Sequence, residues 1–316
     1  MTLQQLEYVL AVDAYKQFST AAEKCFITQP SLSAMIQKLE DELGVKIFDR
    51  SKQPIMPTEL GTEIIAQARL ILNESENLKQ MVKDRMETVS GELRLGIIPT
   101  LAPYLLPLFL KDFSEKYSDL KLSITELTTE NIITHLKKGI LDVGIMATPS
   151  KDNQLFEDPI FYEEFVVYAP NENAILKKDY LLAEDIDANL LMLLQEGHCM
   201  RAQVINLCAL QKTQSSLSNI SYEAGSLETL KRLVEAHSGI TILPHLAVLD
   251  MDEDQMQYIR FFKPPAPVRE ISLVTHRSLA KKRLITVLKE AICDNLPQSI
   301  KKNNKKRVVD FDIKYL

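Results

Sequence analysis

The sequence predicts an α/β fold in two parts, a small helical module that continues into one long helix, and then a larger domain of two α/β lobes. Three observations lead to this prediction. The length of 316 residues corresponds to roughly two domains of about 150 residues each. Residues 58–89 form one helical pattern with no proline. After Gly91 the pattern changes to alternating strands and helices, which is typical of a mainly parallel sheet covered by helices.

Residues 1–57 are expected to form three short helices followed by a hairpin of two short strands. The second helix opens with Ser19 as a candidate N-cap. The third opens with Thr28 as N-cap and a proline in its first turn, where the missing N–H is not needed. Gly44 supplies the C-terminal stop of this helix. One buried stripe is expected along the third helix, at Leu32, Ile36, Leu39 and Leu43.

The long helix at 58–89 carries an apolar seam that repeats by four and three residues. The seam consists of Ile64, Ala68, Ile71, Ser75, Leu78 and Val82. It can be covered by the helix's own domain or by a second copy of the chain. The length of the helix and the charges beside the seam favour a second copy.

Residues 91–300 are expected to form the two-lobed domain. A strand near Phe161 ends the first α/β series, and a strand at 271–274 returns the chain to the first lobe after a proline-rich run. The expected boundaries are 91–162 with 268–300 for lobe I, 163–267 for lobe II, and 301–316 for a basic tail, of which 301–307 carries five positive charges.

Composition narrows the function classes. No stretch reaches the roughly 18 apolar residues of a membrane-spanning helix, and the N-terminus does not resemble a secretory signal, so we expect a cytoplasmic protein with no membrane partner. Four cysteines in this length do not make a disulfide scaffold. The net charge of −6, with 13 acidic and 10 basic residues in 1–90, argues weakly against a nucleic-acid partner, although local charge matters more than the total.

The second and third helices nevertheless fit a helix-turn-helix, in which the start of the later helix enters the major groove of DNA. Opposite the buried stripe lie polar side chains that can contact base edges, and two cations follow in the hairpin, where a wing meets phosphates. The candidate DNA-binding residues are Thr28, Gln29, Pro30, Ser31, Ser33, Gln37, Lys38, Arg50 and Lys52. Any amphipathic three-helix module has a polar face, so these residues alone leave DNA binding undecided.

A cysteine pair is the most informative feature of the second half. Gly197 allows a turn into a helix that begins near Cys199. The start of that helix, with His198 and Arg201 nearby, is expected to lower the thiol pKa. Cys208 lies nine residues on, about 13 Å along a helix, whereas a disulfide joins Cα atoms about 4.4–6.8 Å apart. A bond between the two therefore requires the helix to unfold.

The residues alone also leave a purely structural role open for the cysteines. All four, Cys25 and Cys293 included, can be buried side chains that only pack. A zinc site is disfavoured because there is no Cys-x-x-Cys and the five histidines are scattered. No cysteine hydrolase can be argued from the spacing. We therefore expect no metal and no organic cofactor.

Several N-terminal motifs resemble the winged helix-turn-helix of LysR-type transcriptional regulators. They are Phe18-Ser19-Thr20-Ala21-Ala22, Thr28-Gln29-Pro30-Ser31-Leu32-Ser33, the run from Ile36 to Gly44, Phe48-Asp49-Arg50 and Thr58-Glu59-Leu60-Gly61. The resemblance covers essentially the whole chain. It implies a DNA-binding domain at 1–57, a dimerisation or linker helix at 58–89 and a periplasmic-binding-protein-like effector domain at 91–300. It also implies a homodimer or homotetramer that binds double-stranded DNA and contacts RNA polymerase.

A second group of motifs is similar to the redox centre of the peroxide-sensing members of that family. It comprises Gly197-His198-Cys199 with Arg201 and Cys208, Ile98-Pro99-Thr100, Pro103-Tyr104-Leu105-Leu106-Pro107, Ser226-Leu227-Glu228-Thr229-Leu230, and the run from Ser238 to Pro244. The match implies that Cys199 is the peroxide-reactive thiol and Cys208 the resolving thiol. It further implies a peroxide pocket formed by Thr100, Thr129, His198 and Arg269. The sequence departs from these relatives in two places: Ala202 stands where they have an acidic residue, and residues 209–223 match poorly. The structure that the segment around Cys199 and Cys208 adopts when oxidised is therefore left open.

The resemblance thus implies a transcription regulator rather than an enzyme. In such a regulator, hydrogen peroxide oxidises the thiols to a reversible Cys199–Cys208 disulfide, and the oxidised protein activates oxidative-stress genes. A glutaredoxin- or thioredoxin-type reductant then reduces the disulfide. One alternative is a LysR-type regulator that binds a small metabolite between its lobes, through hydroxyls such as those of Thr100 and Thr129. A second alternative is a thiol peroxidase, which has no use for the first 90 residues.

Overall fold

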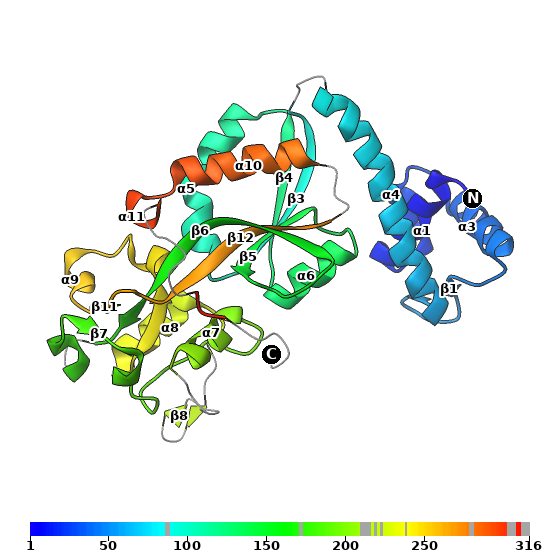
Figure 1. The fold of residues 1–316 in the computed structure, drawn as a ribbon. Coiled ribbons are helices and arrows are strands. Elements are labelled where there is room, and N and C mark those ends of the chain that lie inside the picture. The colour runs from blue at the N-terminus through cyan, green and yellow to red at the C-terminus, as the bar shows by residue number, and fades with distance from the viewer. Residues whose placement is uncertain are drawn as a thin grey trace. The chain divides into compact units, whose positions relative to one another are not determined.

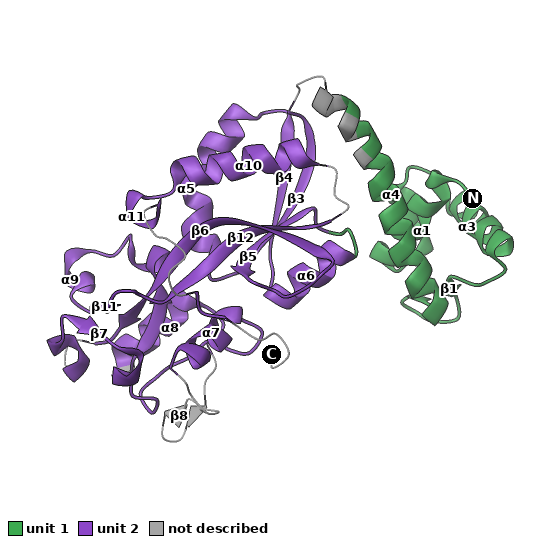
Figure 2. Ribbon diagram, in the orientation of Figure 1, with its two compact units in different colours: residues 1–88, 138–140 green, residues 89–137, 141–316 purple. Residues whose placement is uncertain are grey.

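A computed structural model describes residues 1–85, 89–170, 173–208, 216–217, 220–221, 224–237, 239–277, 281–301 and 308–310. The chain forms two compact units (Figure 2), residues 1–88 with 138–140, and residues 89–137 with 141–316. Most of the expected basic tail and most of the poorly matching segment 209–223 lie outside the described residues. Within the described ranges, no helix is both long and apolar enough to cross a membrane.

The first unit consists of helices and one small hairpin (Figure 1). Its elements are α1 (Leu3–Tyr15), α2 (Phe18–Lys24), α3 (Gln29–Leu43), β1 (Phe48–Asp49), β2 (Met56–Pro57) and α4 (Glu59–Arg85). β1 and β2 pair antiparallel. The expected three helices, hairpin and long helix are therefore confirmed.

The ends of α2 and α3 test the helix caps that the sequence predicts. Thr28 caps α3, since its Oγ1 accepts a hydrogen bond from the Ser31 N–H at 3.4 Å. Gly44 ends α3 at φ 71°, a left-handed conformation that favours glycine. The N-cap expected at Ser19 is wrong. The N-cap of α2 is Gln17, which makes no side-chain cap hydrogen bond, and Ser19 lies inside the first turn.

The apolar seam of α4 has two different surroundings. Its first half faces the core of the first unit, where Ala68 and the adjoining Ile65 are buried against α1 to α3. Its last part is exposed, with 66% of Leu78 and 58% of Val82 accessible to solvent. The unit's own core thus covers Ala68, while Ile64 and Ile71 are only partly buried, and pairing of the seam with a second copy stays a prediction. Among the six seam residues, Leu78 and Val82 are the exposed apolar side chains.

The second unit contains one mixed sheet in the order β4-β3-β5-β12-β6-β11-β7, with β10 paired to β6. These strands are β3 (Gly91–Ile97), β4 (Leu120–Glu126), β5 (Val143–Thr148), β6 (Leu155–Tyr168), β7 (Tyr180–Leu181), β10 (Thr241–Pro244), β11 (Ile259–Phe262) and β12 (Val268–His276). A separate hairpin pairs β8 (Ser216–Leu217) with β9 (Ile220–Ser221). β3 is parallel to β4 and β5, whereas β12 is antiparallel to β5 and β6.

Helices cover this sheet on both faces. They are α5 (Ala102–Lys116), α6 (Thr129–Lys137), α7 (Cys199–Leu207), α8 (Leu227–His237), α9 (Glu253–Met256), α10 (Lys282–Asn295) and α11 (Gln298–Lys301), with the short 3-10 helices η1 (Ala174–Lys177), η2 (Ala183–Asp185) and η3 (His245–Val248). Figure 1 shows α5 and α10 side by side on one face and α6 on the other. The predicted α/β fold class is confirmed, but the expectation of a mainly parallel sheet is wrong, because β12 and β6 pair antiparallel with their neighbours.

Strand β6 belongs to two hydrophobic cores. Its first part pairs with β12, its last four residues pair with β10, and its last three also pair with β11. Phe161 packs with β3, β5, α5 and α10, whereas Phe165 packs with β10, β11 and α8. The unit is therefore two lobes joined through β6 and β12, and the Phe165 N–H accordingly donates to the carbonyl of Pro267, just before β12.

Candidate functional site

Cys199 lies where the two cores of the second unit meet. It is the first residue of α7, directly after His198 as N-cap and Gly197 at φ 91°. The predicted turn and helix start are confirmed. The Cys199 side chain is 2% exposed and belongs to the first core, whereas Met200 and Val204 of the same helix belong to the second. The thiol thus occupies a site that both lobes shape.

Arg269, on β12, is a wholly buried cation close to this thiol. Its Nε and Nη2 each lie 2.8 Å from Oε2 of Glu163, which is also fully buried. Its Nη1 donates to the Thr100 hydroxyl at 3.0 Å, and Nη2 donates to the Thr100 carbonyl at 3.2 Å. The other Glu163 oxygen accepts from the Leu246 N–H at 2.7 Å. The guanidinium is therefore charge-balanced and fixed in direction.

Burial dominates the acidity of Cys199 and raises the pKa of its thiol above the ordinary value. Four groups act in the opposite direction and favour the thiolate. They are the hydroxyl of Thr129, the charge of Arg269, and the backbone N–H groups of Met200 and Ala147. The lowered pKa expected from the sequence is therefore wrong, because desolvation outweighs the helix start and the nearby cation. Arg201 is expected to stabilise the thiolate, but its Nη1 instead donates a hydrogen bond to the Leu194 carbonyl at 2.8 Å.

Two of the predicted pocket residues, Thr129 and Arg269, act on the Cys199 thiol from distant segments. Thr129, the first residue of α6, is fully buried and its Oγ1 faces the thiol, yet this atom makes no hydrogen bond of ordinary geometry within the described part of the chain. Thr100 reaches the same place through Arg269. His198 is 5% exposed, and burial lowers the pKa of its imidazole, so this side chain is neutral at pH 7. A thiol, two hydroxyls and a cation thus form one small polar cluster.

Cys208 has a different environment. It is the half-buried C-cap of α7, and burial raises the pKa of its thiol to about 11. Both cysteines are free thiols. Helix α7 separates them by about 13 Å along its axis, so a bond between them requires α7 to unfold.

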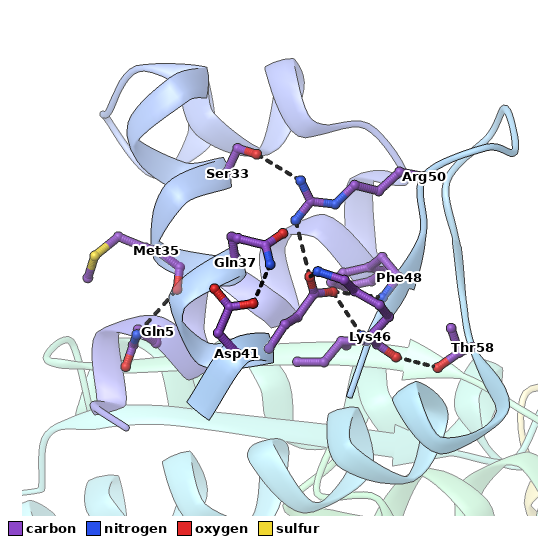
Figure 3. Close-up of polar contacts among 11 residues, drawn as sticks. Gln5, Ser33, Met35, Gln37, Asp41, Lys46, Phe48, Arg50 and Thr58 are labelled. Atoms are coloured by element: carbon purple, nitrogen blue, oxygen red, sulfur yellow. Dashed lines mark hydrogen bonds and ion pairs between the residues drawn. The ribbon is translucent and has the colours of Figure 1, made fainter. Parts of the chain in front are cut away.

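The first unit presents the predicted DNA-contacting residues mainly at its surface. Thr28, Gln29, Pro30 and Ser31 are exposed at the start of α3, Lys38 and Lys52 are exposed further on, and Ser33 and Gln37 are half-buried. The Gln37 amide donates to the Asp41 carboxylate at 2.5 Å (Figure 3). Reading a base with Gln37 therefore requires this contact to open.

The Arg50 side chain contacts α3. Its Nη1 donates to the Ser33 hydroxyl at 3.1 Å (Figure 3), and its Nη2 lies 3.4 Å from Oε2 of Glu40. The guanidinium carbon also lies 5.0 Å from the centre of the Phe18 ring. The hairpin cation thus lies beside a predicted base-reading residue, with 37% of its side chain exposed.

Sequence reasoning missed two acidic residues that organise these sites. Glu40 is 1% exposed, and its Oε1 accepts from the N–H groups of Ile47 and Phe48 at 2.8 and 3.3 Å, which fixes the hairpin to α3. It lies four residues after Ile36 on the buried side of the helix, a position that signals a structural role. On the predicted strand, Glu163 points to the same buried side as Phe161 and Phe165, because alternate residues of a strand face the same way. This alternation could have shown from the sequence that Glu163 is buried.

A groove of 540 Å³ lies between α3 and the hairpin. Its polar lining consists of three cations and two carboxylates with two uncharged side chains, namely Lys46, Arg50, Lys52, Asp49, Glu59, Gln37 and Thr58. Lys46, which also contacts Glu40 at 3.1 Å, was missed from the sequence although it falls in the predicted hairpin. All three cations lie beside carboxylates, Lys46 and Arg50 beside Glu40 and Lys52 beside Asp49, so the groove presents charges of both signs next to the polar face of α3.

Comparison with known protein families agrees with both units. The helix-turn-helix model of the bacterial regulatory lysR family matches residues 3–62, and the LysR substrate binding domain matches residues 87–296. The chain belongs to the LysR family of bacterial helix-turn-helix regulators. A LysR-type regulator binds DNA through its helix-turn-helix, and the candidate residues of α3 lie within the matched region.

Among LysR-family proteins, the similar sequences and structures include peroxide regulators. A hydrogen peroxide-inducible genes activator of Haemophilus influenzae is 34% identical over 275 residues, covering 87% of this chain and 90% of that protein. A full-length OxyR variant from Pseudomonas aeruginosa superposes with a TM-score of 0.77 at 32% identity, covering 93% of this chain and 98% of that one. A hydrogen-peroxide-bound OxyR variant from Corynebacterium glutamicum gives a TM-score of 0.62 at 29% identity, covering 93% and 92% of the two chains.

Proposed function

We propose that this LysR-family regulator senses hydrogen peroxide through Cys199 and is switched by a reversible Cys199–Cys208 disulfide. The observation that carries the proposal is the buried cluster in which the Cys199 thiol meets the Thr129 hydroxyl and the Arg269 guanidinium. Similarity to hydrogen peroxide-inducible activators supports the same function. Regulation, with one oxidation per chain, is proposed in place of enzymatic turnover.

The cluster suits a small, uncharged molecule with two O–H groups. We assign peroxide binding to Thr100, Thr129, His198 and Arg269, with Thr129 Oγ1 available to hydrogen-bond the ligand. The Cys199 thiolate attacks one peroxide oxygen, the O–O bond breaks, and the second oxygen takes a proton and leaves as water. Arg269 stabilises the thiolate before the attack and the negative charge that develops on the leaving oxygen. The product is a sulfenic acid on Cys199.

The resolving step needs a change of structure. The Cys208 thiolate attacks the Cys199 sulfur, the S–S bond forms, the S–O bond breaks, and hydroxide leaves and is protonated to water. Because α7 keeps the two cysteines about 13 Å apart, this step unfolds the helix. Met200 and Val204 leave their places in the second core as α7 unfolds, so the lobe around them rearranges.

The change in the effector domain acts on DNA through an assembly of chains. We propose a homodimer or homotetramer in which the exposed Leu78 and Val82 of α4 pair between copies. The domain at 1–57 then reads double-stranded DNA, with Gln29, Ser33 and Gln37 at base edges. Its remaining contacts are to phosphate or groove edges, from Thr28, Pro30, Ser31, Lys38, Arg50 and Lys52. The linker at 58–89 transmits the change to RNA polymerase, and a glutaredoxin- or thioredoxin-type reductant restores the thiols.

Peptide mapping of the oxidised protein tests the proposed function. A small molar excess of hydrogen peroxide should yield one intramolecular Cys199–Cys208 bond per chain, with Cys25 and Cys293 still free. A main bridge that contains Cys25 or Cys293, or no bridge at all, contradicts the sensor. The alternative of a metabolite-binding regulator predicts no bridge. Multiple turnover of peroxide with a thiol reductant indicates a peroxidase.

A further inference from the structure

Residues 308–310, near the C-terminus, run beside the strand that carries Arg269. Val308 forms a parallel bridge with Val268, the first residue of β12, and the Val309 N–H donates to the Val268 carbonyl at 2.8 Å. Val309 is 8% exposed and packs in the core of the second lobe. The segment is therefore built into the fold, although it lies outside residues 87–296 that match the LysR substrate binding domain.

Two side chains of α7 bind the same segment. The Gln203 Nε2, on a fully buried side chain, donates to the Val309 carbonyl at 3.1 Å. The Asn206 Nδ2 donates to the Asp310 carbonyl at 2.8 Å. Residues three apart lie on the same face of a helix, so this face of α7 is fastened to the segment at two successive positions. Residues 308–310 thus connect α7 to β12.

We propose that residues 308–310 form a strap that holds α7 in its helical, reduced form, and that the strap detaches when the disulfide forms. The inference rests on the disulfide switch proposed above. Gln203 and Asn206 lie between Cys199 and Cys208, so unfolding α7 to join the sulfurs separates their amides from Val309 and Asp310. Each hydrogen bond lost in this way opposes the resolving step.

The strap acts on one step of the switch and not on the other. Neither amide belongs to the groups that act on the Cys199 sulfur, so the attack on peroxide proceeds with the strap attached. The strap therefore sets how readily the sulfenic acid becomes a disulfide, and how stable that disulfide is. This separation of steps distinguishes a strap from a segment that only stabilises the domain.

Full-length variants measured in two separate assays test the strap. Val309→Asp places a charge in a buried position and should displace the segment. Asn206→Ala removes one of the two side-chain bonds. The matched control, Asp310→Asn, changes an exposed side chain and keeps the backbone carbonyl that Asn206 uses. Sulfenic acid formation is followed in chains that also carry Cys208→Ser, and bridge formation in chains with both cysteines, together with the equilibrium in glutathione buffers.

Asn206→Ala should speed bridge formation and shift the thiol–disulfide equilibrium toward the disulfide by about fivefold, or about 20 mV for this two-electron couple. Val309→Asp should have at least this effect. Asp310→Asn should form the bridge at the same rate as the unsubstituted chain. The rate of sulfenic acid formation should be the same in all the variants. Unchanged bridging in a folded Val309→Asp chain overturns the strap.

Two truncations keep the test decisive if Val309→Asp does not fold. A chain that ends at Asp310 retains the strap, and one that ends at Arg307 lacks it. Only the shorter chain should form the bridge faster, and equal rates in the two chains overturn the strap. A full chain that forms no bridge with peroxide overturns the proposed switch and the strap together, whereas a normal bridge with no effect of the variants overturns the strap alone.

Discussion

The two candidate sites of this protein are built in opposite ways. The DNA-binding candidates come from one continuous stretch, 28–52, and most of them are exposed. The thiol cluster takes Thr100, Thr129, Cys199 and Arg269 from four separate segments, and all four are buried. Exposed polar groups stay hydrated, so each can contact DNA independently of the others. Buried polar groups have lost their water and must form hydrogen bonds or ion pairs with one another. Changes at exposed residues of the first site, such as Gln29 and Lys52, should therefore affect binding alone, and changes at the second should affect stability and chemistry together.

Two ion pairs illustrate the difference. Lys52 and Asp49 lie 3.7 Å apart at the surface, where water and salt screen the charges. Arg269 and Glu163 lie 2.8 Å apart with no solvent exposure. Removing one partner of such a buried pair leaves a charge that nothing compensates, which is far more costly than losing an exposed pair.

The largest effect is expected at Arg269. Arg269→Met leaves the Glu163 carboxylate buried without its cation, so the free energy of unfolding should fall by about 3–5 kcal/mol. Urea denaturation of the reduced protein measures it. The double variant Glu163→Leu with Arg269→Met should recover most of the loss, because no buried charge remains. A double variant no more stable than Arg269→Met contradicts this account of the pair.

The pH dependence of the peroxide reaction sharpens the contrast between burial and local charge. Burial raises the pKa of Cys199, so at pH 7 only a small fraction is thiolate, and that fraction grows about tenfold for each pH unit below the pKa. The rate constant of the Cys208→Ser chain with peroxide should rise about tenfold from pH 7 to 8. A plateau at or below pH 8 indicates that the helix start and Arg269 outweigh burial, contrary to the structure.

Gln29 provides a test at the exposed site. If Gln29 reads a base, Gln29→Ala should cost about 1–3 kcal/mol of binding free energy for DNA that carries the preferred base at one position, and little for other sequences. The thermal midpoint should not change, since the side chain is exposed. Binding to a set of operator variants measures this. A uniform loss over all sequences assigns Gln29 to phosphate contact instead.

The smallest effect is expected at Lys52, which should contact phosphate. Lys52→Ala should weaken binding to all DNA sequences and make the salt dependence shallower by about one charge, with an unchanged thermal midpoint. Lys24→Ala, at an exposed position outside the predicted contact set, is the matched control. Equal salt slopes for Lys52→Ala and the unsubstituted chain place Lys52 away from the DNA.

The same contrast explains what the sequence could predict. The helices, the hairpin, the cap at Thr28 and the stop at Gly44 follow from short-range patterns, and the structure has them. The turn at Gly197 and the helix start at Cys199 are local as well. The acidity of Cys199 is not local, because it depends on burial between two cores that meet only in the folded chain. The pairing of Glu163 with Arg269 is not local either, since the two residues are 106 positions apart.

The two single-cysteine variants test the central claim most directly. Burial raises the pKa of both thiols, but at Cys199 four groups act against burial and favour the thiolate, so we expect Cys199 to be the thiol that reacts with peroxide. Second-order rate constants with hydrogen peroxide measure this difference at one pH. We predict that Cys208→Ser keeps the fast reaction and stops at the sulfenic acid, while Cys199→Ser loses the fast reaction and stays reduced. Fast oxidation of Cys199→Ser together with a slow Cys208→Ser would reverse the two roles and contradict the claim that the buried cluster at Cys199 is the sensor.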